Sequence, residues 1–124
     1  TISVPSTKFV AEADYFGMAS GKNTNKFEDT GLTAVRSDKV DAPYVAEFPI
    51  ILECKVIHTH EIGLHIQFIG EIIDVKADEE ILNEKGLPRM DKVDPFVFGH
   101  GIRDYWSLGE TIGRGFDIGK KYRE

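Results

Sequence analysis

Hydrophobic and polar residues alternate most clearly between positions 50 and 60 of the chain. The even positions carry Ile50, Leu52, Cys54, Val56, His58 and His60, whereas the odd positions include Glu53, Lys55 and Thr59. A period of two residues is typical of a β-strand with one buried face. The pattern therefore predicts a strand over residues 49–60 whose even-numbered side chains lie in the core.

A second long strand is predicted after a tight connection at Glu61, Ile62 and Gly63. Residues 64–76 carry apolar side chains at both odd and even positions and end in charged residues. A strand that is apolar on both faces is typically covered on both sides. The two segments together predict a long β-hairpin whose second strand is buried on both faces.

The first eighteen residues predict a strand followed by a helix. Residues 1–4 alternate in a β-branched pattern, as if the strand were entered midway, and Pro5 ends it because proline cannot donate to a β-ladder. Ser6 or Thr7 can cap a helix that continues to about residue 18, since its apolar residues recur at helical spacing.

Shorter elements are predicted along the rest of the chain. Asn25 can cap a short helix that ends at Gly31. Residues 32–47 have no sustained period and indicate extended coil, and residues 78–82 suit a short surface helix. From residue 95 onward glycines separate aromatic residues, which indicates irregular structure with one or two short strands.

Composition narrows the class of protein. The 124 residues are 41% hydrophobic and 29% charged, as in an ordinary single globular domain. The net charge of −6 disfavours a nucleic-acid or anionic-membrane partner, which would need clustered Lys and Arg. No apolar run approaches the roughly 20 residues that span a bilayer. Because Cys54 is the single cysteine, no intramolecular disulfide can form, which suits the cytoplasm.

Three histidines near the hairpin raise the question of a metal site. His58 and His60 are two residues apart on the predicted strand, so they point to the same side as Cys54. That side is also the apolar one, and a tetrahedral site needs further ligands that no nearby cluster supplies. We therefore predict no metal ligands. His65 begins the second strand on the face of Gln67 and can lie at the rim of a pocket.

Several motifs in register over nearly the whole chain resemble the flavin reductase-like proteins of the flavoredoxin type. The residues that carry the resemblance are YFG and SGK near residues 15–22, NKFEDTGLT, DAPYVAEFP, LECKVIHTHEIGLH, QFIGEI and the tail RDYWSLGETIGRGFDIGK. Their shared order makes this signal more specific than any single short pattern.

The resemblance implies a mainly β fold, an FMN-binding split β-barrel with peripheral helices, usually in a homodimer. It also implies that residues 1–124 are a single domain that forms the C-terminal portion of the flavin reductase-like domain, because relatives carry barrel strands before the equivalent of TISVPS. In the family those strands supply much of the contact to FMN. We expect them to be missing from this chain.

The resemblance also suggests which residues meet the cofactor. His65 is expected in the pocket as the catalytic histidine, and the cofactor-binding residues are expected to be Ser20, Gly21, Lys22, Lys26, Tyr105 and Trp106. Each has a plainer interpretation from the residues alone. Residues 20–22 suit a surface turn, Lys26 a solvated helix position, His65 a pocket rim, and the two aromatics a subunit interface.

The function implied is that of an FMN-binding flavoprotein, either a flavin reductase or an electron-transfer oxidoreductase. It would accept electrons from NAD(P)H or a protein donor, and flavin itself would carry out the redox chemistry. One alternative is a non-catalytic dimerising fragment or remnant of the fold without flavin. The other is a metal-binding β protein that uses His58 and His60.

Overall fold

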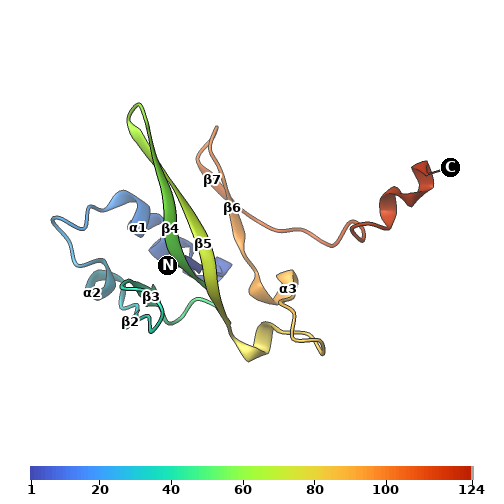
Figure 1. The fold of residues 1–124 in the computed structure, drawn as a ribbon, viewed down its shortest axis with the longest axis horizontal. Helices are drawn as coiled ribbons and strands as arrows, with labels where there is room; N and C mark the ends of the chain where they lie inside the picture. Colours follow the sequence, from blue (N-terminus) through green and yellow to red (C-terminus); the bar gives the residue numbers. More distant parts are fainter. Residues whose placement is uncertain (124) are drawn as a thin grey trace.

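The computed structural model describes residues 1–123 and is mainly β, with short helices at its periphery (Figure 1). The strands are β1 Ile2–Val4, β2 Ala34–Arg36, β3 Pro43–Val45, β4 Ile50–Ile62, β5 His65–Ala77, β6 Phe96–Gly99 and β7 Asp104–Ser107. The helices are α1 Val10–Met18, α2 Lys26–Thr30 and α3 Met90–Val93, and the 3-10 turns are η1 Thr7–Phe9, η2 Glu79–Ile81 and η3 Ile118–Tyr122.

The main sheet has the order β1-β4-β5, and all its pairs are antiparallel. The predicted opening strand is confirmed, since Ile2 pairs with Leu52 and Val4 with Ile50. The predicted hairpin is also confirmed. Its ladder extends further than expected, to the pair Ile62 and His65, so that the turn contains only two residues. The first of these, Gly63, has a φ of 59°, which glycine adopts without strain.

The two predicted helices agree with the structure, whereas the predicted coil does not. The first helix begins as η1 and ends at Met18, although Ser6 makes no side-chain capping bond. The second ends at Gly31, which is left-handed with a φ of 70°. The coil predicted over residues 32–47 is wrong, because β2 and β3 pair there as a small hairpin. Two strands of three residues are too short for a period to be visible.

The buried core lies between the helical N-terminal part and the beginning of β4. Its apolar members are Leu32, Val45, Phe48 and Ile51, and the side chains packed against them are Phe9, Phe16, Phe27 and Tyr44. Residues from α1, α2, β3 and β4 therefore share one small core. This core fixes α1 and the loop that follows it against the base of the hairpin.

Two bulges alter which side chains share a face of the β4–β5 ribbon. The pairing moves from Val56 with Gly70 to His58 with Ile69, so Ile57 is an extra residue on β4. An extra residue shifts the alternation by one. His58 and His60 consequently lie on the face opposite Cys54, and the predicted common face is wrong.

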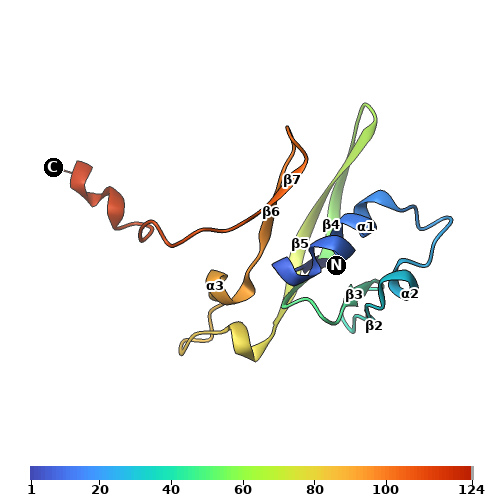
Figure 2. The same cartoon turned by 180° about the vertical axis from the view of Figure 1, so that it is seen from behind.

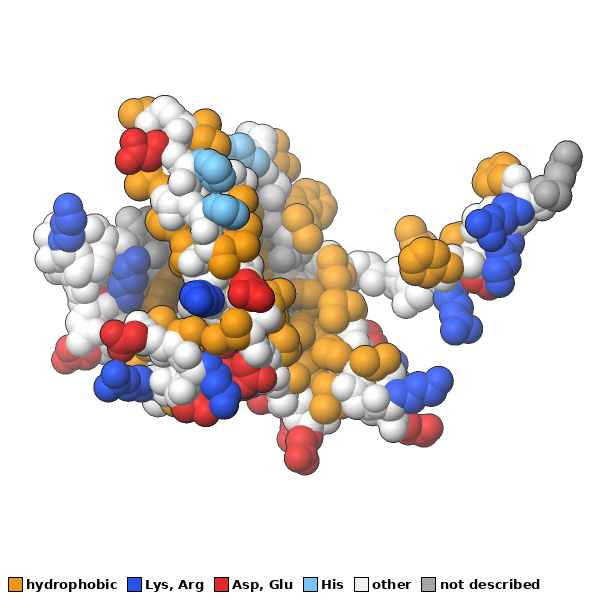
Figure 3. All heavy atoms as spheres, in the orientation of Figure 1, with side chains coloured by type: hydrophobic (Ala, Val, Ile, Leu, Met, Phe, Trp, Pro, Cys, Tyr) orange, Lys and Arg blue, Asp and Glu red, His pale blue; other side chains and the backbone are white. Residues whose placement is uncertain are grey.

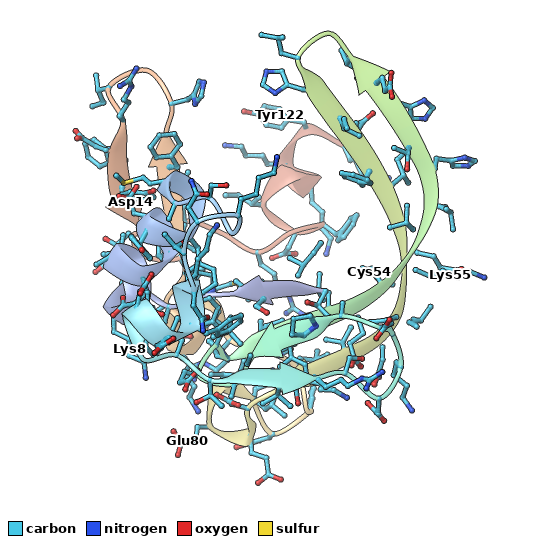
Figure 4. The ribbon with its side chains drawn as sticks, turned by 90° about the vertical axis from the view of Figure 1, so that its left-hand side faces the viewer. Lys8, Asp14, Cys54, Lys55, Glu80 and Tyr122 are labelled. Atoms are coloured by element: carbon cyan, nitrogen blue, oxygen red, sulfur yellow. The ribbon has the colours of Figure 1, made fainter. Side chains whose placement is uncertain are left out.

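The ribbon is curved and has an inner and an outer face. Figure 4 shows Cys54 pointing into the arc of the ribbon and Lys55 pointing out of it. Because paired residues share a face, the register assigns the remaining positions. The inner face contains Leu52, Cys54, Val56, Ile66, Phe68 and Ile72, and the outer face contains Lys55, His58, His60, His65, Gln67, Ile69 and Glu71.

The burial of this ribbon differs from the prediction. The buried residues of β4 are the odd-numbered Ile51 and Glu53, not the even-numbered set. The second strand is not covered on both faces in residues 1–123, because Ile66, Phe68 and Ile72 are each more than half exposed. The even-numbered Leu52, Cys54 and Val56 do share the inner face, but few side chains among residues 1–123 pack against it.

The C-terminal part forms a second hairpin and then leaves the body. β6 pairs with β7, which confirms the short strands predicted in the glycine-rich tail. Beyond β7 the chain leads away from the other elements in both views (Figures 1 and 2). Among residues 1–123 no helix is long and apolar enough to span a membrane.

Candidate functional site

The turn Ser20–Lys22 lies directly after α1, where the helix leaves the small core. Its shape is set by Ser20, whose carbonyl accepts hydrogen bonds from the backbone N–H of Asn23 and from the hydroxyl of Thr24, both at 3.0 Å. Gly21 and Lys22 are exposed, and a Cβ built on Gly21 would have no heavy atom within 4 Å. The turn therefore presents a hydroxyl, an open backbone segment and an ammonium group to the outside.

Lys26 points back to α1 rather than into solvent. Its Nζ donates to the carbonyl of Phe16 at 2.5 Å and lies 5.7 Å from the centre of the Phe16 ring. The carbonyl belongs to the last turn of α1, where helix carbonyls lack partners and favour a cation. Lys26 thus clamps α2 to the end of α1 and holds the Ser20–Lys22 turn between them.

Tyr105 attaches the β6–β7 hairpin to α1. Its hydroxyl donates to a carboxylate oxygen of Asp14 at 2.7 Å, a bond that raises the pKa of Tyr105. Its ring packs against Phe96 and Phe98, with ring centres 5.4 and 5.2 Å apart. Trp106 follows Tyr105 in the strand and therefore lies on the opposite face of the hairpin, where it is 55% exposed. The two aromatics do not form one surface.

His65 is the first residue of β5 and lies beside the turn at the free end of the β4–β5 ribbon (Figure 1). It is exposed and belongs by register to the outer face, together with His58 and His60. The imidazole rings of His58 and His60 have centres 6.2 Å apart, and histidines gather on this side of the ribbon in Figure 3. All three histidines share this face because of the bulge at Ile57, so the register does not set His65 apart from His58 and His60.

A buried ionic cluster that the sequence reasoning missed lies at the base of the ribbon. Glu53 is fully buried, accepts a hydrogen bond from the Ser37 hydroxyl, and has Lys76 Nζ 3.1 Å from its Oε2, an ion pair without hydrogen-bond geometry. Lys76 also lies 3.3 Å from Asp38 and 3.5 Å from Asp74. In the sequence Glu53 stands between the apolar residues Leu52 and Cys54. This alternation predicts a side chain that faces solvent, so the buried position of Glu53 was missed.

The charges of this cluster support one another. Lys76 has its pKa raised chiefly by Glu53 and further by Asp38. The pKa of Asp38 is lowered, first by its bond to Lys76, and that of Asp74 is lowered, first by the backbone N–H of Val75. Lys76, Asp38 and Asp74 are consequently charged at neutral pH, and the cluster ties the loop after β2 to both long strands.

The predicted site residues thus fall into three groups. Ser20, Gly21, Lys22 and Lys26 are brought together at the end of α1, and Tyr105 is anchored to the same helix through Asp14. Trp106 and His65 lie elsewhere. Among residues 1–123, no three His, Cys, Asp or Glu side chains are arranged to hold a metal ion.

Comparison with protein families gives a match that covers most of the chain. Residues 1–102 match the family described as the flavin reductase like domain. The chain belongs to the flavin reductase-like family. The Ser20–Lys22 turn and the β4–β5 ribbon of this flavin reductase-like chain both lie inside the matched region.

Solved structures agree with the assignment. A flavoredoxin of Desulfovibrio vulgaris (Miyazaki F) is 50% identical, with a TM-score of 0.90 over 96% of this chain and 63% of its own. A flavoredoxin from Methanosarcina acetivorans is 29% identical, with a TM-score of 0.88 over 96% of this chain and 62% of its own. A flavin reductase with a split barrel domain from Shewanella frigidimarina is 23% identical, with a TM-score of 0.73 over 90% and 57% of the two chains. The mainly β, split-barrel fold expected from the sequence is confirmed.

The chain is shorter than the proteins it matches. It spans less than two thirds of both flavoredoxins and about half the length of the curated relatives, at 42% and 50%. The flavoredoxin-type resemblance stated from the motifs is confirmed over 96% of this chain.

The exposed turn after α1 fits one end of a flavin mononucleotide. A phosphate needs hydrogen-bond donors and a cation, and backbone without side chains allows the closest approach. Ser20 supplies a hydroxyl, Gly21 leaves its surroundings open, and Lys22 supplies an ammonium. Lys26 is already engaged with Phe16, so it fits the role of holding the turn better than that of binding phosphate directly.

Proposed function

We propose that this chain carries part of an FMN site and belongs to a flavin reductase or electron-transfer flavoprotein. The observation that supports this most directly is the open Ser20–Gly21–Lys22 turn, held by Lys26, in a chain 50% identical to a flavoredoxin. Residues 1–124 would form the C-terminal portion of one domain, and two copies would form a dimer. The single cysteine, Cys54, favours a reducing location such as the cytoplasm.

The roles of the residues follow from their contacts. Ser20 and Lys22 would hold the phosphate, Gly21 would let the backbone approach it, and Lys26 would act as a positioning residue through the Phe16 carbonyl. Bound flavin would accept a hydride or electrons and pass them on. Tyr105 would brace α1 through Asp14, and Trp106, on the free face of the hairpin, would cover the cofactor or a subunit contact.

His65 is proposed as the residue that orients the electron donor. It is exposed at the start of β5 and can donate a hydrogen bond to a nicotinamide or phosphate group of NAD(P)H, or contact a protein donor. Replacing His65 with Ala would then lower nicotinamide-dependent flavin reduction without weakening flavin binding. His60→Ala is a stringent control, because it lies on the same face. Equal losses in both variants would count against a specific role for His65.

The open inner face of the ribbon favours a second candidate, a dimerising fragment of the fold without flavin. The bulge at Ile57 places Cys54 on the face opposite His58 and His60, so Cys54 cannot join them as a ligand in the metal-binding alternative.

Titration with FMN and FAD separates the candidates. We expect FMN fluorescence to be quenched at micromolar protein, and FAD fluorescence to be quenched less, in the full-length protein. Lys22→Glu should weaken FMN binding by roughly tenfold or more, since one charge-assisted bond is worth about 1.5–3 kcal/mol. Lys85→Glu, an equally drastic change in the exposed 83–87 loop, should leave binding unchanged. Absence of quenching by either flavin would leave the fragment without cofactor as the better description.

A further inference from the structure

Residues 108–123, here called the C-terminal arm, are an unpartnered segment of the chain. The arm follows β7 and extends along the longest axis of the molecule, away from the sheet and helices, in both views (Figures 1 and 2). It contains η3 and no strand. A segment of this length without a core of its own is not stabilised by the rest of residues 1–123.

The arm exposes large apolar side chains to an unusual degree. Phe116 is fully exposed, Ile112 is 96% exposed, and Tyr122 and Ile118 are more than half exposed. Single exposed apolar residues are common on protein surfaces, but several in one segment mark a surface that another molecule covers. The arm therefore has the composition of one side of an interface.

The arm is nevertheless locally shaped. The backbone N–H of Ile118 donates to the carbonyl of Arg114 at 3.1 Å, and a Cβ on Gly113 would lie 2.5 Å from the Ile118 side chain. Phe116 has a φ of 59°, a left-handed conformation that bulky residues rarely adopt. The strained backbone displays a fully exposed aromatic ring. Docking of this ring on a partner surface can offset the strain, so Phe116 suits the role of an anchor residue.

Charge indicates what kind of surface receives the arm. The arm holds four basic and two acidic residues, a net charge of +2, whereas residues 1–107 hold eleven basic and eighteen acidic residues, a net charge of −7. The body of another copy of this chain is therefore a complementary surface for the arm.

The match to the solved flavoredoxins extends into the arm. Each matches 96% of this chain, so at most about five residues lie outside the match and most of the sixteen-residue arm lies inside it. Most of the arm therefore belongs to the stretch that aligns with the Desulfovibrio protein, at an overall TM-score of 0.90.

We propose that the arm packs on the body of a second copy, with Phe116 as its apolar anchor and its basic residues facing the acidic body. In a symmetric pair each copy gives its arm and receives the other, so the contact is made twice. This deepens the proposed dimer and does not require bound flavin, so assembly and flavin binding can succeed or fail independently.

Sedimentation of the flavin-free protein tests the proposal. The wild type should sediment as a dimer, and Phe116→Asp should raise the dimer dissociation constant at least tenfold by placing a charge at the anchor. Leu64→Asp is the matched control, because Leu64 is 99% exposed at the turn of the β4–β5 ribbon and should leave the dimer intact. A monomeric wild type, an unchanged dimer in Phe116→Asp, or equal losses in both variants would overturn the proposal.

Cross-linking identifies which copy receives the arm. A photo-reactive benzoylphenylalanine in place of Phe116 would be activated in an equal mixture of ¹⁴N- and ¹⁵N-labelled protein that has been unfolded and refolded together, so that mixed dimers are present. Cross-linked peptide pairs of mixed isotope composition, joining the arm to residues 1–107, are the expected result. Pairs from one isotope alone would mean that the arm folds onto its own chain and would refute the exchange.

Discussion

At the scale of single residues, Glu53 carries the most consequence for how the ribbon is held. Its carboxylate is fully buried on β4 and joins the Ser37 hydroxyl to the Lys76 ammonium. The alternating pattern assigned Glu53 to solvent, because a pattern along one strand contains no information about the loop that covers it. The Ser20–Lys22 turn, in contrast, was predictable because glycine and polar residues after a helix indicate a turn wherever they lie.

Replacing Glu53 with Ala should destabilise the fold by on the order of 2–3 kcal/mol. The change removes a buried carboxylate, leaves the Ser37 hydroxyl without its acceptor and deprives Lys76 of its nearest partner. Urea unfolding followed by circular dichroism measures the loss. Asp41→Ala is the control: its partner is Arg36, both side chains are more than 80% exposed, and such pairs contribute about 0–1 kcal/mol. Equal midpoints for the two variants would mean that the buried cluster contributes no more than a surface pair.

At the scale of elements, long patterns were predictable and pairing was not. The two long strands were located to within two residues at each end, because a strand of thirteen residues is long enough for its hydrophobic pattern to be recognised. The bulge at Ile57 could not be predicted, since it exists only in the register with β5. That single extra residue decides which face His58 and His60 share, so the error about the histidines follows from it.

Tyr105 provides a test of how the β6–β7 hairpin is attached to α1. Tyr105→Phe keeps the ring against Phe96 and Phe98 but removes the bond to Asp14. We expect a loss of about 0.5–1.5 kcal/mol and faster hydrogen exchange over residues 96–107. Trp106→Phe is the control, because Trp106 lies on the opposite face of the hairpin. It keeps the bond between Tyr105 and Asp14 and should leave hydrogen exchange over residues 96–107 unchanged.

The same contact should respond to alkaline pH. The bond to Asp14 raises the pKa of Tyr105, so the protonated phenol is favoured in the folded state. Its contribution to stability is fully present below about pH 10, the ordinary pKa of tyrosine, and is lost as the pH rises through the higher folded value. The difference in stability between wild type and Tyr105→Phe should shrink over that range. A difference that stays constant would exclude the bond as its cause.

At the scale of the whole molecule, the inner face of the ribbon is apolar, continuous and uncovered in residues 1–123. Val56, Ile66, Phe68, Ile72 and Val75 are each more than half exposed. The alternating pattern predicted that this face is buried, and in residues 1–123 it is not, because few of the described side chains pack against it. The hydrophobic pattern of a strand predicts that one face is covered, but it does not identify the segment that covers it.

Two neighbouring substitutions test whether the inner face is covered in the working protein. Phe68 lies on the inner face opposite Thr59, and Gln67 lies on the outer face opposite His60, so Phe68→Glu and Gln67→Glu place the same charge on opposite sides of β5. If further barrel strands or a second copy cover the inner face, Phe68→Glu loses the burial of an aromatic ring, about 1.5–3 kcal/mol, and also buries a carboxylate. Unfolding by urea and light scattering would show lower stability and altered mass for Phe68→Glu, whereas Gln67→Glu should remain within about 0.5 kcal/mol of wild type. Equal stability of the two variants would mean that water reaches both faces of the ribbon in the native protein.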